Sequence, residues 1–232
     1  MGLDLKATEA TLPGPTPIFA LLPPGAARGV VVLHEIFGRT PEIDRVVERF
    51  ARRGMAAVAP DLFAAGFKPL CIAAAMRDSV RGTGAAFGRV RAARDWLCAT
   101  AGLAADKVGV IGFCLGGGFA LAAGPDYGSV STNYGDVPAS EVMRGIGPVI
   151  GCYGGRDRVF GRMGAKLKAR LAPLGVVPEV LDYPSVGHSF LTDGRHPIAA
   201  ALSRFTLHTE AVDPRIREEA WARIFEFFER TL

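Results

Sequence analysis

Short apolar runs alternate along the chain with longer segments whose apolar residues recur every three or four positions. An unbroken apolar run is typical of a strand in a parallel sheet that is covered on both faces. On this basis the clearest strands are predicted at residues 29–33, 55–60, 107–111, 148–153 and 177–183. Weaker patterns predict further strands at residues 3–8, 18–22 and 128–134.

The segment after residue 33 shows how the helices are predicted. Thr40 suits the N-cap, Pro41 suits the first helical position, and Gly54 closes the pattern. The apolar residues between them keep helical spacing at Ile43, Val46, Val47 and Phe50. Similar signals predict helices over residues 71–80, 87–99, 117–123 and 161–174, and from Asp213-Pro214 to the end of the chain. Residues 191–210 are expected to form a loop or a short helix.

Strands that alternate with helices predict an α/β fold. We expect a mostly parallel central sheet of about seven to eight strands, flanked by helices on both faces. No linker or internal repeat interrupts the pattern, so residues 1–232 are expected to form a single domain.

One predicted strand-to-helix junction has the sequence Gly112-Phe113-Cys114-Leu115-Gly116. This is the nucleophile-elbow pattern, with cysteine at the position that serine usually holds. An abrupt turn from strand to helix strains the middle residue and projects its side chain from the edge of the sheet. The alternative is a glycine-rich turn that packs a buried cysteine, because free cysteine is often buried. Cys114 is therefore a candidate nucleophile.

Three further polar residues follow the ends of other predicted strands: Glu35, Asp157 and His188. Ligand sites in open α/β sheets lie at the carboxyl ends of the strands. The order nucleophile, acid, histidine is that of α/β hydrolases. Each residue also has a structural alternative: Asp157 as a loop cap, His188 as a loop histidine and Glu35 as a partner of an arginine. Their joint occurrence in this order favours a catalytic group.

The chemistry assigns a role to each residue. His188 acts as a base and then as an acid toward the leaving alkoxide, and Asp157 orients its ring. The backbone amides of Leu115 and Ile36 are the candidate oxyanion hole. Thiolate attack on an ester or lactone gives a thioester that water hydrolyses. Amides are poorer substrates, because a thiolate leaves the tetrahedral intermediate more readily than an unprotonated amine.

Four motifs together resemble those of the dienelactone hydrolase family, within the α/β-hydrolase superfamily. They are His34-Glu35-Ile36-Phe37-Gly38, Gly112-Phe113-Cys114-Leu115-Gly116-Gly117, Tyr153-Gly154-Gly155-Arg156-Asp157 and Gly187-His188-Ser189-Phe190. The resemblance implies an α/β-hydrolase fold and hydrolysis of carboxymethylenebutenolide-type lactones in aromatic compound degradation. It implies that Glu35 activates the nucleophile, contacting the resting thiol and taking its proton when substrate displaces an arginine partner.

The resemblance also implies two arginines that hold a substrate carboxylate, one of them a few residues beyond the histidine. Here Leu191 and Thr192 occupy that region, and Arg195 lies further on. Arg77 or Arg81 could serve as the other arginine, or face solvent. Phe37, in the first motif, is a further candidate substrate contact. Two alternatives therefore stay open: a general carboxylesterase or thioesterase, and a non-catalytic protein whose thiol binds a ligand or senses oxidation.

Composition narrows the remaining functions. Of the 232 residues, 49% are hydrophobic and 22% charged, which argues against disorder. The net charge of +4 is scattered, so nucleic-acid binding is not expected. No signal-peptide pattern or membrane-spanning apolar run is present. The four cysteines form no metal-binding or redox spacing, so we expect no metal, no cofactor and a cytoplasmic protein. A monomer or small homo-oligomer that acts on a small-molecule ester or lactone is expected.

Overall fold

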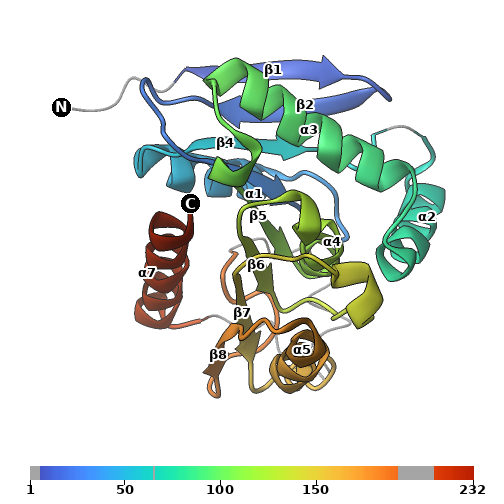
Figure 1. Ribbon diagram of the computed structural model, residues 1–232, viewed down its shortest axis with the longest axis vertical. Helices are drawn as coiled ribbons and strands as arrows, with labels where there is room; N and C mark the ends of the chain where they lie inside the picture. Colours follow the sequence, from blue (N-terminus) through green and yellow to red (C-terminus); the bar gives the residue numbers. More distant parts are fainter. Residues whose placement is uncertain (1–5, 65, 193–211) are drawn as a thin grey trace.

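The computed structural model describes residues 6–64, 66–192 and 212–232 (Figure 1). Its strands form one eight-stranded sheet in the order β1-β2-β4-β3-β5-β6-β7-β8. β2 runs antiparallel to both of its neighbours, and every other pair is parallel, which confirms the mostly parallel sheet. The strands are β1 (Ala7–Leu12), β2 (Thr16–Leu21), β3 (Gly29–Leu33), β4 (Ala56–Pro60), β5 (Val108–Phe113), β6 (Val130–Asn133), β7 (Val149–Gly154) and β8 (Glu179–Tyr183).

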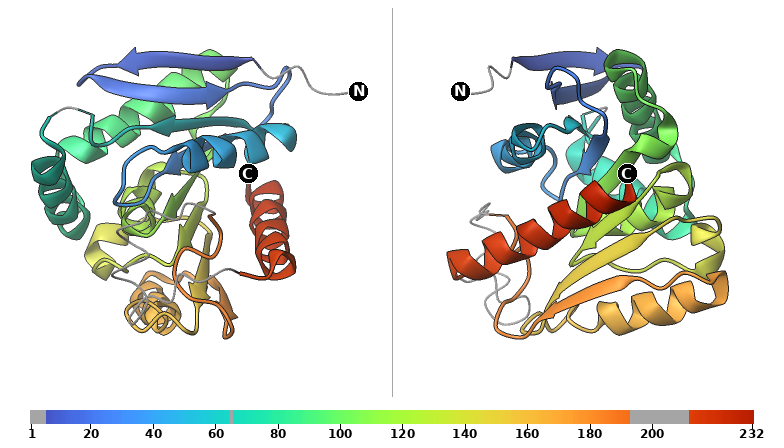
Figure 2. Two further views of the ribbon diagram at one scale, coloured as in Figure 1. Left: turned by 180° about the vertical axis from the view of Figure 1, so that it is seen from behind. Right: turned by 60° about the vertical axis from the view of Figure 1, so that its left-hand side comes forward.

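Helices cover both faces of the sheet. The right-hand view of Figure 2 separates α1 and α7, on one side, from α3 and α5 on the other. The described helices are α1 (Pro41–Arg52), α2 (Lys68–Arg81), α3 (Ala85–Ala101), α4 (Leu115–Ala123), α5 (Met163–Leu171) and α7 (Pro214–Thr231). Short 3₁₀ turns lie at η1 (Ala105–Lys107), η2 (Gly124–Asp126), η3 (Ser140–Met143) and η4 (Ala172–Leu174).

Each face of the sheet has its own apolar core. Where α1 meets α7, Phe50 of α1 is fully buried against the rings of Trp221, Phe225 and Phe228 of α7. The opposite core joins α3, α4 and α5 to the sheet through residues such as Val90. The central strands are buried on both faces, which explains their unbroken apolar sequence.

Two local predictions differ from the structure. The first described strand is Ala7–Leu12 and runs past the predicted end at residue 8, because the turn at Gly14 (φ 77°) sets its register by pairing Leu12 with Thr16. Residues 3–5 of that prediction lie outside the described residues. Thr40 stands at the N-cap of α1, but its side chain makes no capping bond. The first turn closes instead through the Thr40 carbonyl, which accepts from the amide of Ile43 at 2.9 Å.

The helix that follows β5 packs against the sheet with almost no space between them. A Cβ atom at Gly112 would lie 1.9 Å from the carbonyl oxygen of Gly116. A Cβ atom at Gly116 would lie 2.4 Å from the carbonyl oxygen of Leu33, at the end of β3. The glycines therefore allow the backbone-to-backbone approach that fixes the start of α4 over the sheet.

Substitution of Gly112 by alanine is expected to destabilise the fold by about 3 kcal/mol, because the new methyl group meets backbone that cannot rotate away. Gly88, which is exposed in α3 with no atom near its Cβ position, is the matched control. Gly88→Ala should gain roughly 0.5–1 kcal/mol of helix stability. Urea unfolding of both variants measures the two effects. Equal stability of Gly112→Ala and the wild type would contradict the packing described here.

Candidate active site

The backbone of Cys114 has the strained conformation of a nucleophile elbow. Its φ and ψ angles are 53° and −117°, a region that non-glycine residues rarely occupy. The amide of Cys114 donates to the carbonyl of Asn133 at 3.0 Å, and its carbonyl accepts from the amide of Gly117 at 3.0 Å. The thiol is partly buried between the end of β5 and the start of α4. The turn therefore holds one reactive side chain in a fixed direction at the sheet edge.

Asp157 and His188 come together although 31 positions separate them in sequence. The Nδ1–H of His188 donates to Oδ2 of Asp157 at 2.7 Å, and both side chains are buried. The other carboxylate oxygen of Asp157 accepts from the amides of Val159 and Phe160, each at 2.9 Å. These backbone bonds fix the carboxylate, which in turn fixes the orientation of the imidazole.

The surroundings of His188 favour its protonated form. Burial by itself would lower the pKa of the imidazole, since the charged ring loses water. The hydrogen bond to Asp157 and the nearby Cys114 sulfur outweigh burial and raise the pKa to about 10. Nε2 is buried and has no hydrogen-bonded partner within the described residues, although Cys114 is close enough to affect the ring. A protonated His188 beside Cys114 would stabilise a thiolate by charge.

Glu35 is a buried carboxylate that hydroxyl groups surround. Its Oε1 atom accepts from Ser189 Oγ at 3.0 Å and from Thr192 Oγ1 at 3.2 Å. The phenol of Tyr134 lies 3.4 Å from the Thr192 hydroxyl and also interacts with Glu35. Burial raises the pKa of Glu35, while the positive charge of His188 and the three hydroxyls act against that rise. Thr192 thus lies in the region where the family resemblance implied an arginine.

Tyr134 connects this carboxylate to His188. Its ring packs edge-on against His188 with centroids 4.8 Å apart, and it is fully buried. Tyr134 and Ser189 have positive φ angles of 43° and 57°, which are uncommon for residues with a Cβ atom. Two loops in strained conformations therefore bring Tyr134 and Ser189 to Glu35.

The two candidate oxyanion-hole amides lie next to these groups in the sequence. Leu115 is the first residue of α4, where backbone amides have no partner within the helix. Ile36 lies in a turn closed by a bond of 3.1 Å from the Gly38 amide to the Glu35 carbonyl. Phe37 is partly buried in the same turn. The oxyanion role of the Leu115 and Ile36 amides and the substrate contact of Phe37 stay predictions.

The two candidate arginines within the described residues lie four positions apart on α2, and both are exposed. Arg77, on α2, has a side chain that is 59% exposed and lies 3.7 Å from the carboxylate of Asp78. Arg81 is exposed at the last turn of the same helix. Arg195 lies outside the described residues. Recognition of a substrate carboxylate by these side chains therefore stays a prediction.

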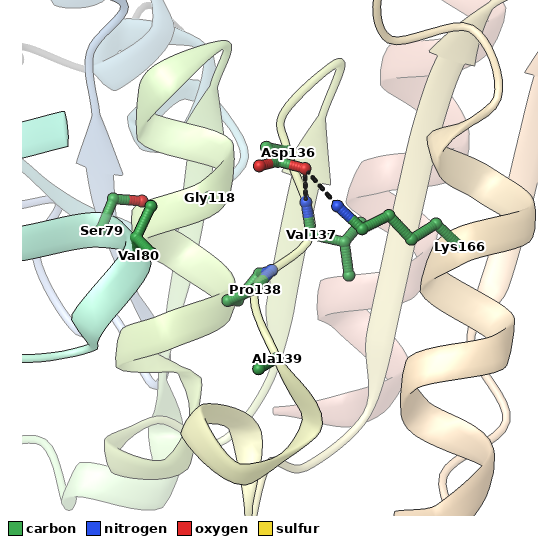
Figure 3. Close-up of a pocket in the computed structure, with 8 residues that line it drawn as sticks. All are labelled: Ser79, Val80, Gly118, Asp136, Val137, Pro138, Ala139 and Lys166. Atoms are coloured by element: carbon green, nitrogen blue, oxygen red, sulfur yellow. Dashed lines mark hydrogen bonds and ion pairs between the residues drawn. The ribbon is translucent and has the colours of Figure 1, made fainter. Parts of the chain in front are cut away.

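A cavity of about 210 Å³ lies beside α4 and is distinct from the catalytic group. Figure 3 shows Ser79 and Val80 of α2 on one side of it, with Lys166 of α5 on the other. Lys166 Nζ forms an ion pair of 2.7 Å with Asp136. Cys114, Asp157 and His188 do not line this cavity.

Two features are absent from the part of the chain that the structure describes. No group of three or more His, Cys, Asp or Glu side chains is arranged to hold a metal ion in that part of the chain. None of its helices is long and apolar enough to cross a membrane.

Sequence reasoning did not single out Tyr134, Ser189 or Thr192 as partners of Glu35. The available signal was their position, since Tyr134 follows β6 and the other two follow His188. Of the remaining cysteines, Cys152 is fully buried, whereas Cys98 is partly buried and packs against the core.

The sheet order, the helices on both faces and the elbow after β5 define an α/β hydrolase. Solved structures with this fold include a protein designated m3DLH, which is 24% identical with a TM-score of 0.80 over 100% of both chains. A dienelactone hydrolase-like promiscuous phosphotriesterase from metagenomic libraries is 22% identical, with a TM-score of 0.74 over 98% of both chains. At these identities the likeness shows the fold.

Sequence comparisons identify the family. The family model for the dienelactone hydrolase family matches residues 18–232. A carboxymethylenebutenolidase from Rhodococcus opacus is 30% identical over 90% of this chain and 83% of its own length. The chain belongs to the dienelactone hydrolase family, and it is a hydrolase that acts on ester or lactone bonds.

Substitution of Glu35 by glutamine is expected to change how stability depends on pH. The raised pKa of Glu35 means that the folded state binds this proton more tightly than the unfolded state. The stability that it contributes is present at low pH and is lost as the pH rises above about 4.5. The free energy of unfolding of the wild type should therefore fall relative to Glu35→Gln as the pH rises.

Glu218→Gln is the control, for which the opposite dependence of stability on pH is expected. Two hydrogen bonds from the Arg49 guanidinium lower the pKa of Glu218, so its contribution is lost as the pH falls. Urea unfolding from below pH 4.5 to neutral pH measures both differences. A wild-type stability that rises relative to Glu35→Gln with pH would show that Glu35 is stabilised in its ionised form.

Proposed function

We propose that the chain hydrolyses small esters or lactones through a Cys114–His188–Asp157 triad and a thioester intermediate. The supporting observation is the 2.7 Å hydrogen bond between His188 and a fully anchored Asp157, with Nε2 of the histidine near Cys114. The strained elbow backbone of Cys114 adds to this support, because it presents the thiol at the sheet edge.

Acylation begins with transfer of the thiol proton to Glu35, beside a His188 ring that already carries its own proton. The thiolate sulfur attacks the carbonyl carbon, and the carbonyl oxygen becomes an oxyanion that the amides of Leu115 and Ile36 stabilise. Collapse of this intermediate breaks the carbon–oxygen bond, and His188 Nε2 gives its proton to the leaving alkoxide. The products of this half-reaction are an alcohol, or the opened end of a lactone, and the Cys114 thioester.

Deacylation uses the same groups in reverse. Neutral His188 removes a proton from water, and the resulting hydroxide oxygen attacks the thioester carbon. The second oxyanion collapses with loss of the Cys114 thiolate, which leaves the carboxylic acid product and a protonated His188. Asp157 holds the imidazole in position through both halves, because its hydrogen bond to Nδ1 favours the required tautomer.

Glu35 is the proposed activating carboxylate. A carboxylate whose pKa is raised is a stronger base and is better suited to accept a thiol proton. The charge of His188 and the surrounding hydroxyls favour the ionised form, which keeps this base available. Among the described residues, the hydroxyls of Ser189 and Thr192 hold Glu35, so we expect its position not to depend on a substrate carboxylate.

The hydroxyl groups of Ser189 and Thr192 around Glu35 favour the second candidate function, a general carboxylesterase or thioesterase, over an enzyme specific for carboxylate-bearing lactones. Among the arginines considered, Arg77 lies 3.7 Å from Asp78 and is largely exposed. Neutral esters are accordingly the proposed substrate class, with lactone hydrolysis in aromatic compound degradation as the alternative that the family suggests. The four unpaired cysteines support a reducing compartment such as the cytoplasm.

The Cys114→Ala variant is expected to lose ester hydrolysis by about 10⁴-fold or more, because the nucleophile of a covalent mechanism is absent. The rate of p-nitrophenyl acetate hydrolysis measures this loss, and circular dichroism checks the fold. Cys71→Ala, which removes another partly buried thiol on α2, should keep the wild-type rate. Wild-type turnover by Cys114→Ala would exclude the triad proposed here.

The charge of the substrate separates the two candidate functions. We expect a neutral methyl ester of a lactone carboxylic acid to be hydrolysed at least as fast as the free acid, because hydroxyls rather than an arginine hold Glu35. The measurement is kcat/KM for the two compounds at neutral pH. A preference of about tenfold or more for the charged compound, about 1.4 kcal/mol, would instead indicate a cation at the substrate site.

A further inference from the structure

A buried histidine that the proposed mechanism does not use lies directly before Glu35. His34 follows the last residue of β3 and is only 1% exposed. Its Nδ1 atom lies 2.7 Å from the carbonyl oxygen of Glu35. Its Nε2 atom accepts from the backbone amide of Leu62 at 3.0 Å, and its ring packs edge-on against Phe63. Both ring nitrogens therefore have backbone partners in two different loops.

These partners determine where the proton of His34 lies. A carbonyl oxygen can only accept a hydrogen bond, so Nδ1 must carry a hydrogen. A backbone amide can only donate, so Nε2 must be unprotonated. His34 is thus a neutral ring in a single tautomer, set by the amide of Leu62. The carboxylate of Asp61 lies 3.6 Å from Nε2, beyond hydrogen-bond distance, and accepts from the amide of Phe63 at 2.9 Å.

The bond from His34 acts on one particular peptide group. The Glu35 carbonyl and the Ile36 amide belong to the same planar unit, and in a trans peptide they point in opposite directions. We infer that His34 is a positioning residue, which holds the Glu35 carbonyl so that the Ile36 N–H points toward the oxyanion. This inference rests on the proposed function, because the oxyanion role of Ile36 belongs to it.

The same carbonyl has a second donor. The amide of Gly38 reaches it at 3.1 Å and closes the turn that contains Ile36 and Phe37. The bond from His34 is shorter and comes from a ring that is fixed at its other nitrogen. Hydrogen bonds to a carbonyl also polarise the peptide and make its N–H a stronger donor. His34 therefore both restrains the direction of the Ile36 amide and strengthens it.

The competing explanation is that His34 only ties the loop after β3 to the loop after β4. In that case its removal would lower stability without a selective effect on the transition state. A positioning role predicts a different pattern, in which kcat falls and both KM and the reactivity of the Cys114 thiol are kept. An oxyanion amide acts on the transition state and has no part in alkylation of the thiol.

Two substitutions of nearly equal size separate these explanations. The amide nitrogen of asparagine in His34→Asn can reach the position of Nδ1 and donate to the Glu35 carbonyl. The side chain of His34→Leu fills similar space and donates nothing. The measurements are kcat and KM for p-nitrophenyl acetate, and the rate of Cys114 alkylation by iodoacetamide, followed by peptide mass spectrometry. Thermal unfolding reports the stability of both variants.

We expect kcat of His34→Leu to fall by about tenfold to a hundredfold, with KM within about twofold of the wild type. His34→Asn should recover most of this loss, and Cys114 should be alkylated at the wild-type rate in both variants. Wild-type kcat in His34→Leu, equal losses in both variants, or a parallel loss of alkylation would overturn the positioning role. Cys114→Ala distinguishes failure of the proposed function, since full turnover in that variant would remove the thioester route itself.

Discussion

The contact between α4 and the sheet is the constraint on which the rest of the site depends. Gly112 and Gly116 let the backbone of α4 lie against β5 and against the end of β3. This approach leaves no length of chain for a relaxed turn, so Cys114 must absorb the change of direction with a positive φ angle. Because the turn is fixed by backbone contacts, the direction of the thiol does not depend on the packing of variable side chains. The strain at Cys114 is balanced by the buried apolar packing of α4 on the sheet.

The polar groups at this edge are buried, so each needs a hydrogen-bond partner in place of the water it has lost. Backbone amides anchor Asp157, Asp157 anchors His188, and hydroxyls surround Glu35. An unpaired charge in such surroundings would be costly, so the site places Glu35 close enough to His188 for their opposite charges to interact. The positions of Asp157, His188 and Glu35 are thus set by hydrogen bonds that begin at backbone and hydroxyl groups.

The sequence allowed the sheet, the helices and the four polar strand ends to be predicted, for physical reasons that are local. A strand buried on both faces must be apolar throughout, as residues 29–33 are, and α1 must bury Ile43 and Phe50 on one face. The carboxyl ends of parallel strands meet at one edge, which placed Glu35, Asp157 and His188 near Cys114. The partners of Glu35 could not be predicted in this way. Ser189 reaches Glu35 through a left-handed backbone conformation, which glycine, asparagine and aspartate favour and which a serine in the sequence does not indicate. The end of the first strand, at Leu12, was predicted too early because its alternation is weak and the turn at Gly14 sets its register.

The two sides of the site are held in different ways, and this difference separates chemistry from substrate choice. Cys114, Asp157 and the Ile36 peptide are held by contacts to backbone atoms, including the bond from His34 to the Glu35 carbonyl. Side-chain substitutions elsewhere leave such contacts in place. The groups around Glu35 are side-chain hydroxyls, those of Ser189 and Thr192. An exchange at a position such as Thr192 can therefore replace a charged group by a hydroxyl without removing the backbone bonds that hold Asp157. It follows that the proposed thiol chemistry can stay constant within this fold while the charge of the preferred substrate changes.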